Sequence, residues 1–405
     1  MFKNQKARNA FYIGLLCSIS YLAVYFARNV LSAVSPAMVE EGCVDTIFLG
    51  DASSLYFIAY AVGQLINGLI GDKISAKYMI SVGLISAGLA TFVFPSVVTS
   101  LPEAALGVYA LTGFFLSMIY APMTKVIAES TDPFYAPRCS LGYTFSSFLG
   151  SPLAGAAAAF FAWQGVFYTG GAFLALMACS VFVAFAIFEK KGIIVKSKKS
   201  EAIANSSSFK DKIRVLVKHD IIKFTLYSVL TGIIRTTVVF WMPTYFSQRL
   251  GFSADESALI YTVTTFIISF STFISVFVYE RLGHNMNATV FVMFCVSVIF
   301  FALLFVTKNP FLNIAFLVIA IMGGNAVASM IWVRYCPGLR DTGMVSSATG
   351  FLDFISYMSA SVSSSVFAGA VDVIGWNGLV LVWLGLMVIG VAVSFPYHKL
   401  KKFSE

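Results

Sequence analysis

The stretch EKKGIIVKSKKSEAIANSSSFKDKIRVLVKH, residues 189–219, is the longest polar segment in an otherwise strongly apolar sequence. Six long apolar segments precede it and six follow it. A polar segment in this position is typical of a linker that joins two halves of similar size. We therefore predict a basic linker over 188–220, an N-terminal six-helix half at 1–187 and a C-terminal six-helix half at 221–405.

The composition is that of a membrane protein. Of the 405 residues, 59% are hydrophobic and 11% are charged, and the mean hydropathy is +0.85. Soluble domains carry roughly 25% charged residues, so these values exclude a soluble enzyme, a disordered chain and a secreted disulfide scaffold. Each membrane-spanning helix needs about 20 apolar residues, and the length leaves room for roughly a dozen of them.

The apolar segments are long enough to cross a bilayer, and glycine, proline and charged residues separate them. We predict an all-α polytopic membrane protein in which twelve transmembrane helices form two pseudo-symmetric six-helix bundles. The predicted spans are residues 11–34, 50–71, 78–97, 104–127, 139–162, 165–187, 221–246, 257–279, 287–307, 311–333, 345–371 and 376–396. Tight turns are expected at 98–103, 163–164 and 372–375.

Basic residues are concentrated on one side of the predicted membrane. An even number of spans places both termini on that side, where 23 of the 27 lysines and arginines fall in loops and span ends. Only Arg249 and Lys308 fall on the opposite side. Since basic loops are retained in the cytoplasm, both termini are predicted to be cytoplasmic, with the chain in the inner (plasma) membrane. The net charge of +8 thus reflects topology in a lipid bilayer and not a nucleic-acid partner.

The two halves repeat one another in sequence. Arg28 lies in the first span of the first half, and Arg235 lies 207 residues later in the first span of the second half. Asp72 and Glu280, which follow the second span of each half, are 208 residues apart. Two independent pairs with almost the same offset indicate a tandem duplication of a six-helix unit.

A charged segment follows the second span of each half. In the first half, Gly68 and Gly71 precede Asp72 and Lys73, and Lys77 follows them. This segment resembles the loop between helices two and three of the major facilitator superfamily, and the resemblance implies the major facilitator fold. We expect a conformational latch on the cytoplasmic side, formed by Asp72, Lys73, Lys77, Glu280 and Arg281. A surface ion pair contributes only about 0–1 kcal/mol, so such a latch biases a conformational equilibrium.

Three charged residues lie firmly inside predicted spans, namely Arg28, Arg235 and Asp353. A charge at that depth costs roughly 2.5–3.5 kcal/mol on insertion scales, so each is expected to face the interior of the bundle. A guanidinium binds phosphate or carboxylate through a planar fork of donors. Two such groups against one acid predict a central cavity that binds a small anion. The alternative, in which Asp353 is the structural partner of one arginine, stays open.

Polar and aromatic residues near these charges form the candidate binding surface. Tyr21, Tyr25 and Arg28 share one helix face through their i, i+4, i+7 spacing, and similar stripes occur in the second and eleventh spans. The candidate substrate-binding residues are Arg28, Arg235, Tyr21, Tyr25, Tyr60, Gln64, Asn67, Tyr143, Ser147, Trp241, Asp353 and Tyr357. The six cysteines and three histidines have no metal-ligand spacing, so neither a metal nor a cofactor is expected.

The segments around the two arginines resemble one transporter family more closely. Residues 21–29, YLAVYFARN, and residues 235–245, RTTVVFWMPTY, are similar to the first and seventh helices of the organophosphate:phosphate antiporters. The resemblance implies a carrier that works by alternating access, in which Arg28 and Arg235 grip the phosphoryl group of a sugar phosphate or glycerol phosphate. It also implies inorganic phosphate as the counter-substrate. No nucleophile–base pair lies at membrane depth, so we expect a transporter and not an enzyme, acting as a monomer.

The sequence departs from the antiporter pattern at several positions. Asn29 and Gln64 stand where well-studied members carry lysine, and Ser147 and Thr265 stand near a histidine and a glutamate of the family. Asp353 stands where glycine is common, and it has three open roles: a salt-bridge partner, a proton site or a contact to a cationic substrate group. The rival functions are a proton-coupled symporter of organic carboxylates that uses Asp353, and a non-transporting sensor with a transporter fold.

Overall fold

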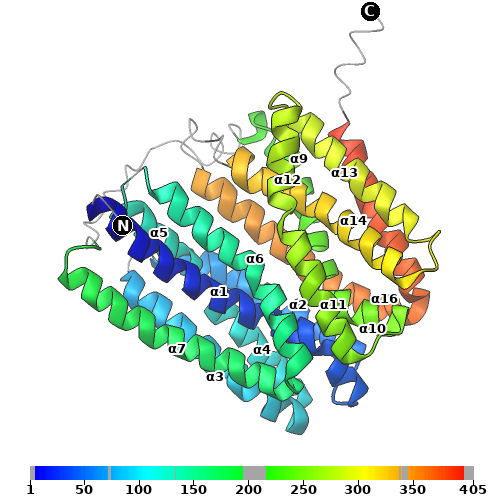
Figure 1. Cartoon of the computed structure of the whole chain (residues 1–405), viewed down its shortest axis with the longest axis horizontal. Helices are drawn as coiled ribbons and strands as arrows, with labels where there is room; N and C mark the ends of the chain where they lie inside the picture. Colours follow the sequence, from blue (N-terminus) through cyan, green and yellow to red (C-terminus); the bar gives the residue numbers. More distant parts are fainter. Residues whose placement is uncertain are drawn as a thin grey trace, which may run out of the picture. The chain divides into compact units, whose positions relative to one another are not determined.

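The computed structural model describes residues 5–71, 74–132, 134–194, 216–336, 339 and 345–395. Within these residues every regular element is helical, and ten helices are long and apolar enough to cross a membrane (Figure 1). The dominance of helices follows from the apolar sequence, because a backbone surrounded by lipid must satisfy its hydrogen bonds within its own segment.

Helices account for all twelve predicted spans. The helix α16, Val345–Ser394, combines the eleventh and twelfth spans, which meet at Gly375, where φ is 65° and ψ is 175°. Glycine adopts such a left-handed φ without the steric penalty that a side chain brings. The fifth span corresponds to α6, Ala136–Phe160, whose apolar second half forms the shorter apolar helix Leu149–Phe160. The predicted all-α fold is thus confirmed, and the described helices correspond to the twelve predicted spans.

The chain is organised as two compact units. Unit 1 comprises Met1–Asn205 and Phe252–Val263, and unit 2 comprises Ser206–Gly251 and Thr264–Glu405. The helices of unit 1 are α1 (Gln5–Glu40), α2 (Thr46–Gly71), α3 (Ala76–Ser100), α4 (Pro102–Leu116), α5 (Tyr120–Ser130), α6 and α7 (Trp163–Lys190). Within this unit α1 packs against α6, α2 against α4, and α3 against both α4 and α7. Of the predicted linker, residues 195–215 lie outside the described residues.

Unit 2 has the same kind of organisation. Its helices are α9 (Ile221–Gly232), the π-helical turn η1 (Ile233–Val238), α10 (Val239–Leu250), α12 (Ser271–Arg281), α13 (Met286–Leu303), α14 (Pro310–Met330), the π-helical turn η2 (Ile331–Tyr335) and α16. The helix α11, Ala254–Ser269, is divided between the two sets of residues. Within unit 2, α9 packs against α16, α12 against α14, and α13 against both α14 and α16.

The helix pairings of unit 1 recur in unit 2. In each unit the first span packs against the fifth, the second against the fourth, and the third against the fourth and the sixth; in unit 2, Ser228 meets Leu352 of the eleventh span and Phe294 meets Gly390 of the twelfth. The fourth span of each unit begins with proline in its first turn, and these residues, Pro102 and Pro310, are 208 positions apart, as Asp72 and Glu280 are. Proline is favoured there because the first turn of a helix needs no backbone donor. Two pseudo-symmetric six-helix bundles are therefore present.

Several spans that are continuous in sequence are interrupted in the structure. The fourth span breaks at residues 117–119 between α4 and α5, and the eighth breaks at Phe270 between α11 and α12. The seventh and tenth spans contain the π-helical turns η1 and η2. Neither break coincides with a proline or a charge, so the hydrophobic pattern does not indicate them. The turn predicted at 163–164 lies at 161–162 instead, because α7 begins at Trp163.

Candidate functional site

Arg28 lies among aromatic rings from two helices of unit 1. Its guanidinium carbon is 5.3 Å from the centroid of the Tyr25 ring, 5.3 Å from that of Tyr60 and 5.8 Å from that of Phe57. Tyr25 belongs to α1, whereas Phe57 and Tyr60 belong to α2. An aromatic face attracts a guanidinium by about 0.5–2 kcal/mol and orients it without itself supplying a negative charge. Arg28 is therefore a half-buried, oriented cation, which suits the binding of an anion.

Four tyrosines pack together next to this arginine. The ring centroid of Tyr21 is 5.0 Å from that of Tyr25, 5.5 Å from that of Tyr143 and 5.9 Å from that of Tyr120. The rings come from α1, α5 and α6. The structure thus brings together three predicted site residues and adds Tyr120, which the sequence pattern does not indicate. Tyr120 begins α5 directly after the break in the fourth span, and nothing in the hydrophobic pattern indicates that break.

A close contact between α1 and α6 fixes the backbone that carries Tyr25 and Arg28. A Cβ atom at Gly150 of α6 would lie 2.4 Å from the Cβ of Tyr25 and 2.5 Å from its carbonyl carbon. No side chain fits at that distance, so Gly150 allows the two helices to approach at this level. Ser147 of α6, a predicted site residue, is half-buried. Asn29 donates its side-chain amide to the Tyr25 carbonyl at 2.6 Å, so that amide is directed to its own helix.

The side chains of α2 divide into two groups. Phe57, Tyr60 and Gln64 follow i, i+3, i+7 spacing and share the helix face that meets Arg28; Gln64 is half-buried. Asn67, which was predicted for the site, is buried and donates its amide to the Ser117 hydroxyl at 2.7 Å. Asn67 therefore supports the break between α4 and α5. The spacing of Phe57 from Tyr60 is the signal that identifies Phe57 as the third aromatic neighbour of the cation.

In unit 2, Arg235 lies within the π-helical turn η1. The other five residues of this turn are buried, whereas Arg235 is half-buried. A π-helical turn inside an α-helix is rare and is frequently found at functional sites. Thr237, in the same turn, donates a hydrogen bond to the Ala360 carbonyl at 2.9 Å and lies 2.8 Å from the Ser363 hydroxyl. These contacts hold the turn that carries Arg235 against α16.

Small and polar residues join α9 to α16 one turn earlier. The Ser228 hydroxyl donates to the Leu352 carbonyl at 2.6 Å. A Cβ atom at Gly232 would lie 2.5 Å from a backbone oxygen of α16. These two contacts therefore fix how closely the segment leading into η1 approaches α16, the helix that carries Asp353 and Tyr357.

Asp353 and Tyr357 lie one turn apart on α16 of unit 2. Asp353 is half-buried and Tyr357 is buried. Burial raises the pKa of the Cys336 thiol, and the nearby Asp353 carboxylate raises it further. A hydrogen bond with Thr349 lowers this pKa. The carboxylate is thus within electrostatic range of a buried thiol at the end of η2. Its role among the three alternatives stays a prediction.

Trp241, the other predicted site residue of unit 2, is fully buried in an aromatic cluster. Its ring centroid is 5.6 Å from that of Phe240 and 6.4 Å from that of Trp376. Tyr245 extends the cluster, since its ring lies 5.3 Å from Trp376 and its hydroxyl donates to Asn313 at 2.7 Å. Trp241 contributes packing to this end of unit 2, and its contact with a substrate stays a prediction.

The predicted latch is described only in part. Asp72 and Lys73 lie outside the described residues. The Lys77 ammonium is 2.9 Å from a carboxylate oxygen of Glu189, and both side chains are largely buried. This pair joins the beginning of α3 to the end of α7 within unit 1. Glu189 was not predicted to take part in the latch.

The remaining latch residues and the second arginine belong to unit 2. Glu280 and Arg281 are exposed in the last turn of α12, and the guanidinium carbon of Arg281 is 5.1 Å from the Phe277 ring centroid. Their action as a latch stays a prediction. Arg28 and Arg235 belong to different units, so the structure describes the surroundings of each arginine within its own unit.

Known proteins match the chain over most of its length. Residues 17–364 match the Major Facilitator Superfamily. The chain is 23% identical to the phosphoglycerate transporter protein of Salmonella typhimurium, over 94% of this chain and 87% of that protein. It is 24% identical to the glycerol-3-phosphate transporter of Bacillus subtilis, over 92% and 88% of the two proteins. A shorter segment, 24% of this chain and 22% of the relative, is 31% identical to the membrane sensor protein UhpC of Salmonella typhimurium.

The fold also agrees with solved transporters. A bacterial homolog of the human lysosomal transporter Spinster, crystallised in an inward-facing and unoccupied conformation, matches with a TM-score of 0.76. The match covers 95% of this chain and 96% of that one at 13% identity, which shows the fold alone. Because the superfamily match spans most of the sequence, the chain belongs to the Major Facilitator Superfamily and is a multi-pass membrane transporter, with relatives among the organophosphate transporters.

Proposed function

We propose that the protein is a secondary active transporter of small phosphorylated organic anions of the sugar phosphate or glycerol phosphate type. Arg28 and Arg235 together bind the phosphoryl group, and inorganic phosphate is the counter-substrate. The setting of Arg28 carries this proposal: a half-buried guanidinium within a transmembrane helix, 5.3–5.8 Å from three ring centroids. A permanent charge at that depth is costly, and its planar fork matches phosphate oxygens.

The full-length relatives support the same substrate class. One is a phosphoglycerate transporter and the other a glycerol-3-phosphate transporter. The other candidates are proposed to line the site: Tyr21, Tyr25, Tyr60, Gln64, Tyr143 and Ser147 from unit 1, and Trp241, Asp353 and Tyr357 from unit 2. Tyrosine hydroxyls donate hydrogen bonds to phosphate oxygens and accept them from sugar hydroxyls. They would therefore recognise both parts of such a substrate.

Alternating access gives the two arginines a second role. Without an anion, two like charges directed at one substrate site repel each other, and the repulsion opposes closure. A bound phosphoryl group offsets this repulsion and so binds the closed state better than the open one, which is the condition for a ligand to shift a conformational equilibrium. The empty carrier then reorients slowly, and transport becomes an exchange of anions.

Reconstitution into liposomes loaded with labelled inorganic phosphate tests the proposal, with external sugar phosphates and glycerol phosphates as partners. We expect Arg28→Lys and Arg235→Lys each to slow exchange at least about 30-fold, because an ammonium loses the bidentate fork at a cost of about 2 kcal/mol. Arg249→Lys is the matched control, since Arg249 is exposed and its guanidinium donates to Asn377. Normal exchange by both variants would refute the two-arginine site.

A proton-coupled symport of organic carboxylates is the second candidate function, and the half-buried carboxyl group of Asp353 favours it. In that case a pH gradient drives uptake into liposomes that contain no anion, and Asp353→Asn abolishes the response to the gradient. Uptake that requires internal phosphate and ignores the gradient would exclude symport. A non-transporting sensor, the third alternative, would show neither exchange nor uptake.

The orientation in the membrane is also part of the proposal. The concentration of lysine and arginine on the side of both termini supports cytoplasmic termini in the inner (plasma) membrane. A reporter enzyme fused after the last residue, active only on one side of the membrane, reads this orientation directly. Activity outside the cytoplasm would overturn it.

A further inference from the structure

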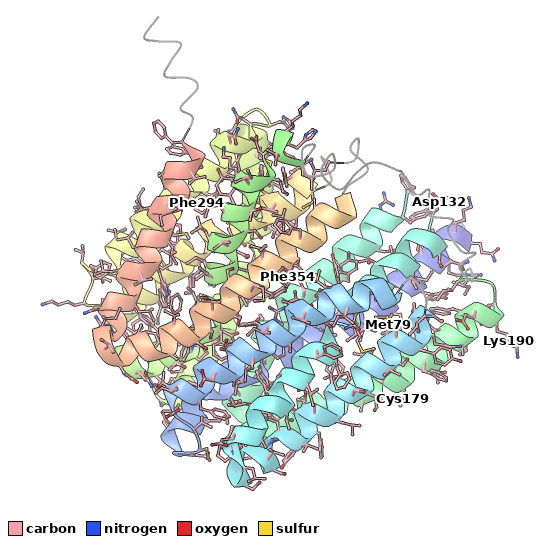
Figure 2. The ribbon with its side chains drawn as sticks, turned by 180° about the vertical axis from the view of Figure 1, so that it is seen from behind. Met79, Asp132, Cys179, Lys190, Phe294 and Phe354 are labelled. Atoms are coloured by element: carbon pink, nitrogen blue, oxygen red, sulfur yellow. The ribbon has the colours of Figure 1, made fainter. Side chains whose placement is uncertain are left out.

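A groove lies between the beginning of α1 and the beginning of α6 in unit 1. Its volume is about 350 Å³, and its lining includes Ala7, Phe11 and Leu15 of α1 and Arg138 and Cys139 of α6. Asp132, which Figure 2 labels, lies just before α6. Its carboxylate is 3.2 Å from the Lys6 ammonium at the beginning of α1. The groove therefore begins at one end of unit 1, and its inner end, at Ser18 and Gly142, lies one turn from Tyr21 and next to Tyr143 of the proposed anion site.

The walls of the groove are apolar and open to the surroundings. Phe11 is 48% exposed and Leu15 is 45% exposed, although both lie on a transmembrane helix. Two glycines allow α1 and α6 to approach closely along the groove. A Cβ atom at Gly14 would lie 3.0 Å from the Cys139 sulfur, and one at Gly142 would lie 2.8 Å from the Ser18 hydroxyl. The groove therefore accepts a slender apolar group between two closely packed helices.

The groove runs from the membrane surface into one leaflet of a bilayer. From Phe11, where the predicted first span begins, to Ser18 an α-helix rises about 10 Å, within the roughly 15 Å that half of the hydrocarbon core measures. Among the described lining residues the charge is at Arg138, near the beginning of α6. A headgroup with the first part of its acyl chain has this same polarity and length.

Two arginines flank the charged end. The Arg138 guanidinium carbon is 4.4 Å from the Phe134 ring centroid and 5.8 Å from that of Tyr135, so the ring faces hold it at the mouth. Arg8 lies three residues before Phe11 and is exposed on the same face of α1. The nearby Lys6 is paired with Asp132, and this pair adds no net charge. Among the side chains that the structure describes there, the two arginines give the mouth a positive excess, which favours an anion.

We propose that this groove binds an anionic phospholipid, with one acyl chain along Phe11 and Leu15 and the phosphate at Arg138 and Arg8. Clusters of basic residues at the membrane surface attract anionic headgroups with about 1 kcal/mol per residue, or about five-fold in affinity. The site belongs to unit 1 alone and does not depend on which anion is transported. A zwitterionic phospholipid has the same acyl chains but no net charge, so it should bind in the groove with lower affinity than an anionic phospholipid.

The experiment uses the full chain in vesicles of phosphatidylcholine that contain a small fraction of phosphatidylglycerol with a photoactivatable acyl chain. We expect cross-links within residues 7–18 and 134–142, at least five times more than with a phosphatidylcholine probe of the same chain. Arg138→Gln and Arg8→Gln should each lower the yield about five-fold, whereas Arg249→Gln, a matched change of an exposed arginine in unit 2, should not.

A second variant separates the chain from the headgroup. Ala7→Phe fills the groove without changing its charge and should abolish cross-linking inside it, while cross-links elsewhere on the protein persist. Equal labelling by the two probes, or labelling unaffected by Arg8→Gln, Arg138→Gln and Ala7→Phe, would overturn the proposal. These readouts do not measure transport, so failure of the proposed transport activity leaves the result unaffected.

Discussion

In unit 1 the close approach of the first and fifth spans depends on Gly150 of α6, which meets the backbone of Tyr25 on α1. In unit 2 the equivalent spans, α9 and α16, approach just as closely, but the glycine is on the other helix: Gly232 of α9 meets Ser356. Each contact lies one turn before the arginine of its unit, Arg28 or Arg235. The two units thus have the same contact with the partner residues exchanged.

The same exchange occurs between the second and fourth spans. In unit 1, Asn67 of the second span donates to Ser117, at the break in the fourth, over 2.7 Å. In unit 2, Asn325 of the fourth span donates to Ser271, directly after the break in the second, over 2.6 Å. In both cases an asparagine of one helix donates to a serine at the break in the neighbouring helix. The duplication has therefore retained the geometry of the helix pairs more strongly than the identity of the residues at each position.

The largest expected effect comes from the two glycines. Gly150→Ala and Gly232→Ala each place a Cβ atom 2.4–2.5 Å from the facing helix, and such overpacking lowers the free energy of unfolding by about 2–3 kcal/mol. Gly107→Ala and Gly385→Ala are the matched controls, because no atom lies within 4 Å of their Cβ positions, and they should stabilise by about 0.5–1 kcal/mol. Thermal unfolding in detergent measures all four. If Gly232→Ala is tolerated and Gly150→Ala is not, the two glycine contacts are not equivalent.

Removing one asparagine should have a smaller effect. Asn67→Ala and Asn325→Ala each remove a buried hydrogen bond and should cost about 1 kcal/mol. The two losses should add, since the sites lie in separate units. The sharper test exchanges the partners: Asn67→Ser with Ser117→Asn reproduces in unit 1 the arrangement of unit 2. The double variant should recover part of the stability that each single change loses, and no recovery would show that the exchange requires other adjustments.

The aromatic contacts of Arg28 give the next prediction. Tyr60→Leu removes a ring 5.3 Å from the guanidinium carbon and should raise the KM for exchange about five-fold, the equivalent of about 1 kcal/mol. Tyr60→Phe keeps the ring and is the control for the cation–ring contact. If the phenylalanine variant loses as much as the leucine variant, the hydroxyl and not the ring face is what matters at this position.

The sequence predicts the helices of this protein well, but it does not predict the contacts between them. Twelve spans, the division into two halves and Arg28 with Tyr25 on one face all follow from hydrophobic length and helical spacing, which are local properties. The exchanged contacts are not local. Gly150 and Gly232 stand at different places in their repeats, so comparing the two half-sequences position by position cannot pair them.

The hydrophobic pattern of the sequence also does not predict where the helices are interrupted. Apart from Arg235 itself, the π-helical turn consists of β-branched residues, in the sequence IIRTTV, and these residues are common in regular transmembrane helices, so the sequence does not indicate the turn. It is held by hydrogen bonds such as that from Thr237 to Ala360, 123 residues away. The spacing of Asn67 along α2 predicts a site residue. Its actual partner, Ser117, can be identified only once the break in the fourth span is known.

The smallest expected effect concerns the side-chain interaction (the tie) that joins the beginning of the first span to the end of the fourth span in each unit. In unit 1 the tie is ionic, between Lys6 and Asp132 at 3.2 Å. In unit 2 it is neutral, because the Tyr335 hydroxyl donates to the His219 carbonyl at 2.8 Å. The backbone N–H of Phe134 and then the Lys6 ammonium hold the pKa of Asp132 below its usual value. Only the tie of unit 1 should therefore respond to acid.

The direction of that response follows from the lowered pKa. A carboxyl group whose pKa is lower in the folded state stabilises the fold above its unfolded pKa, which is about 3.9 for aspartate. This contribution is lost as the pH falls through the folded value. Asp132→Asn should thus lower the melting temperature slightly at pH 7 and leave it unchanged at a pH well below 3.9, whereas Tyr335→Phe should lower it equally at both. An Asp132→Asn effect that persists in acid would mean that the carboxylate contributes through packing, and the contrast between an ionic and a neutral tie would then fail.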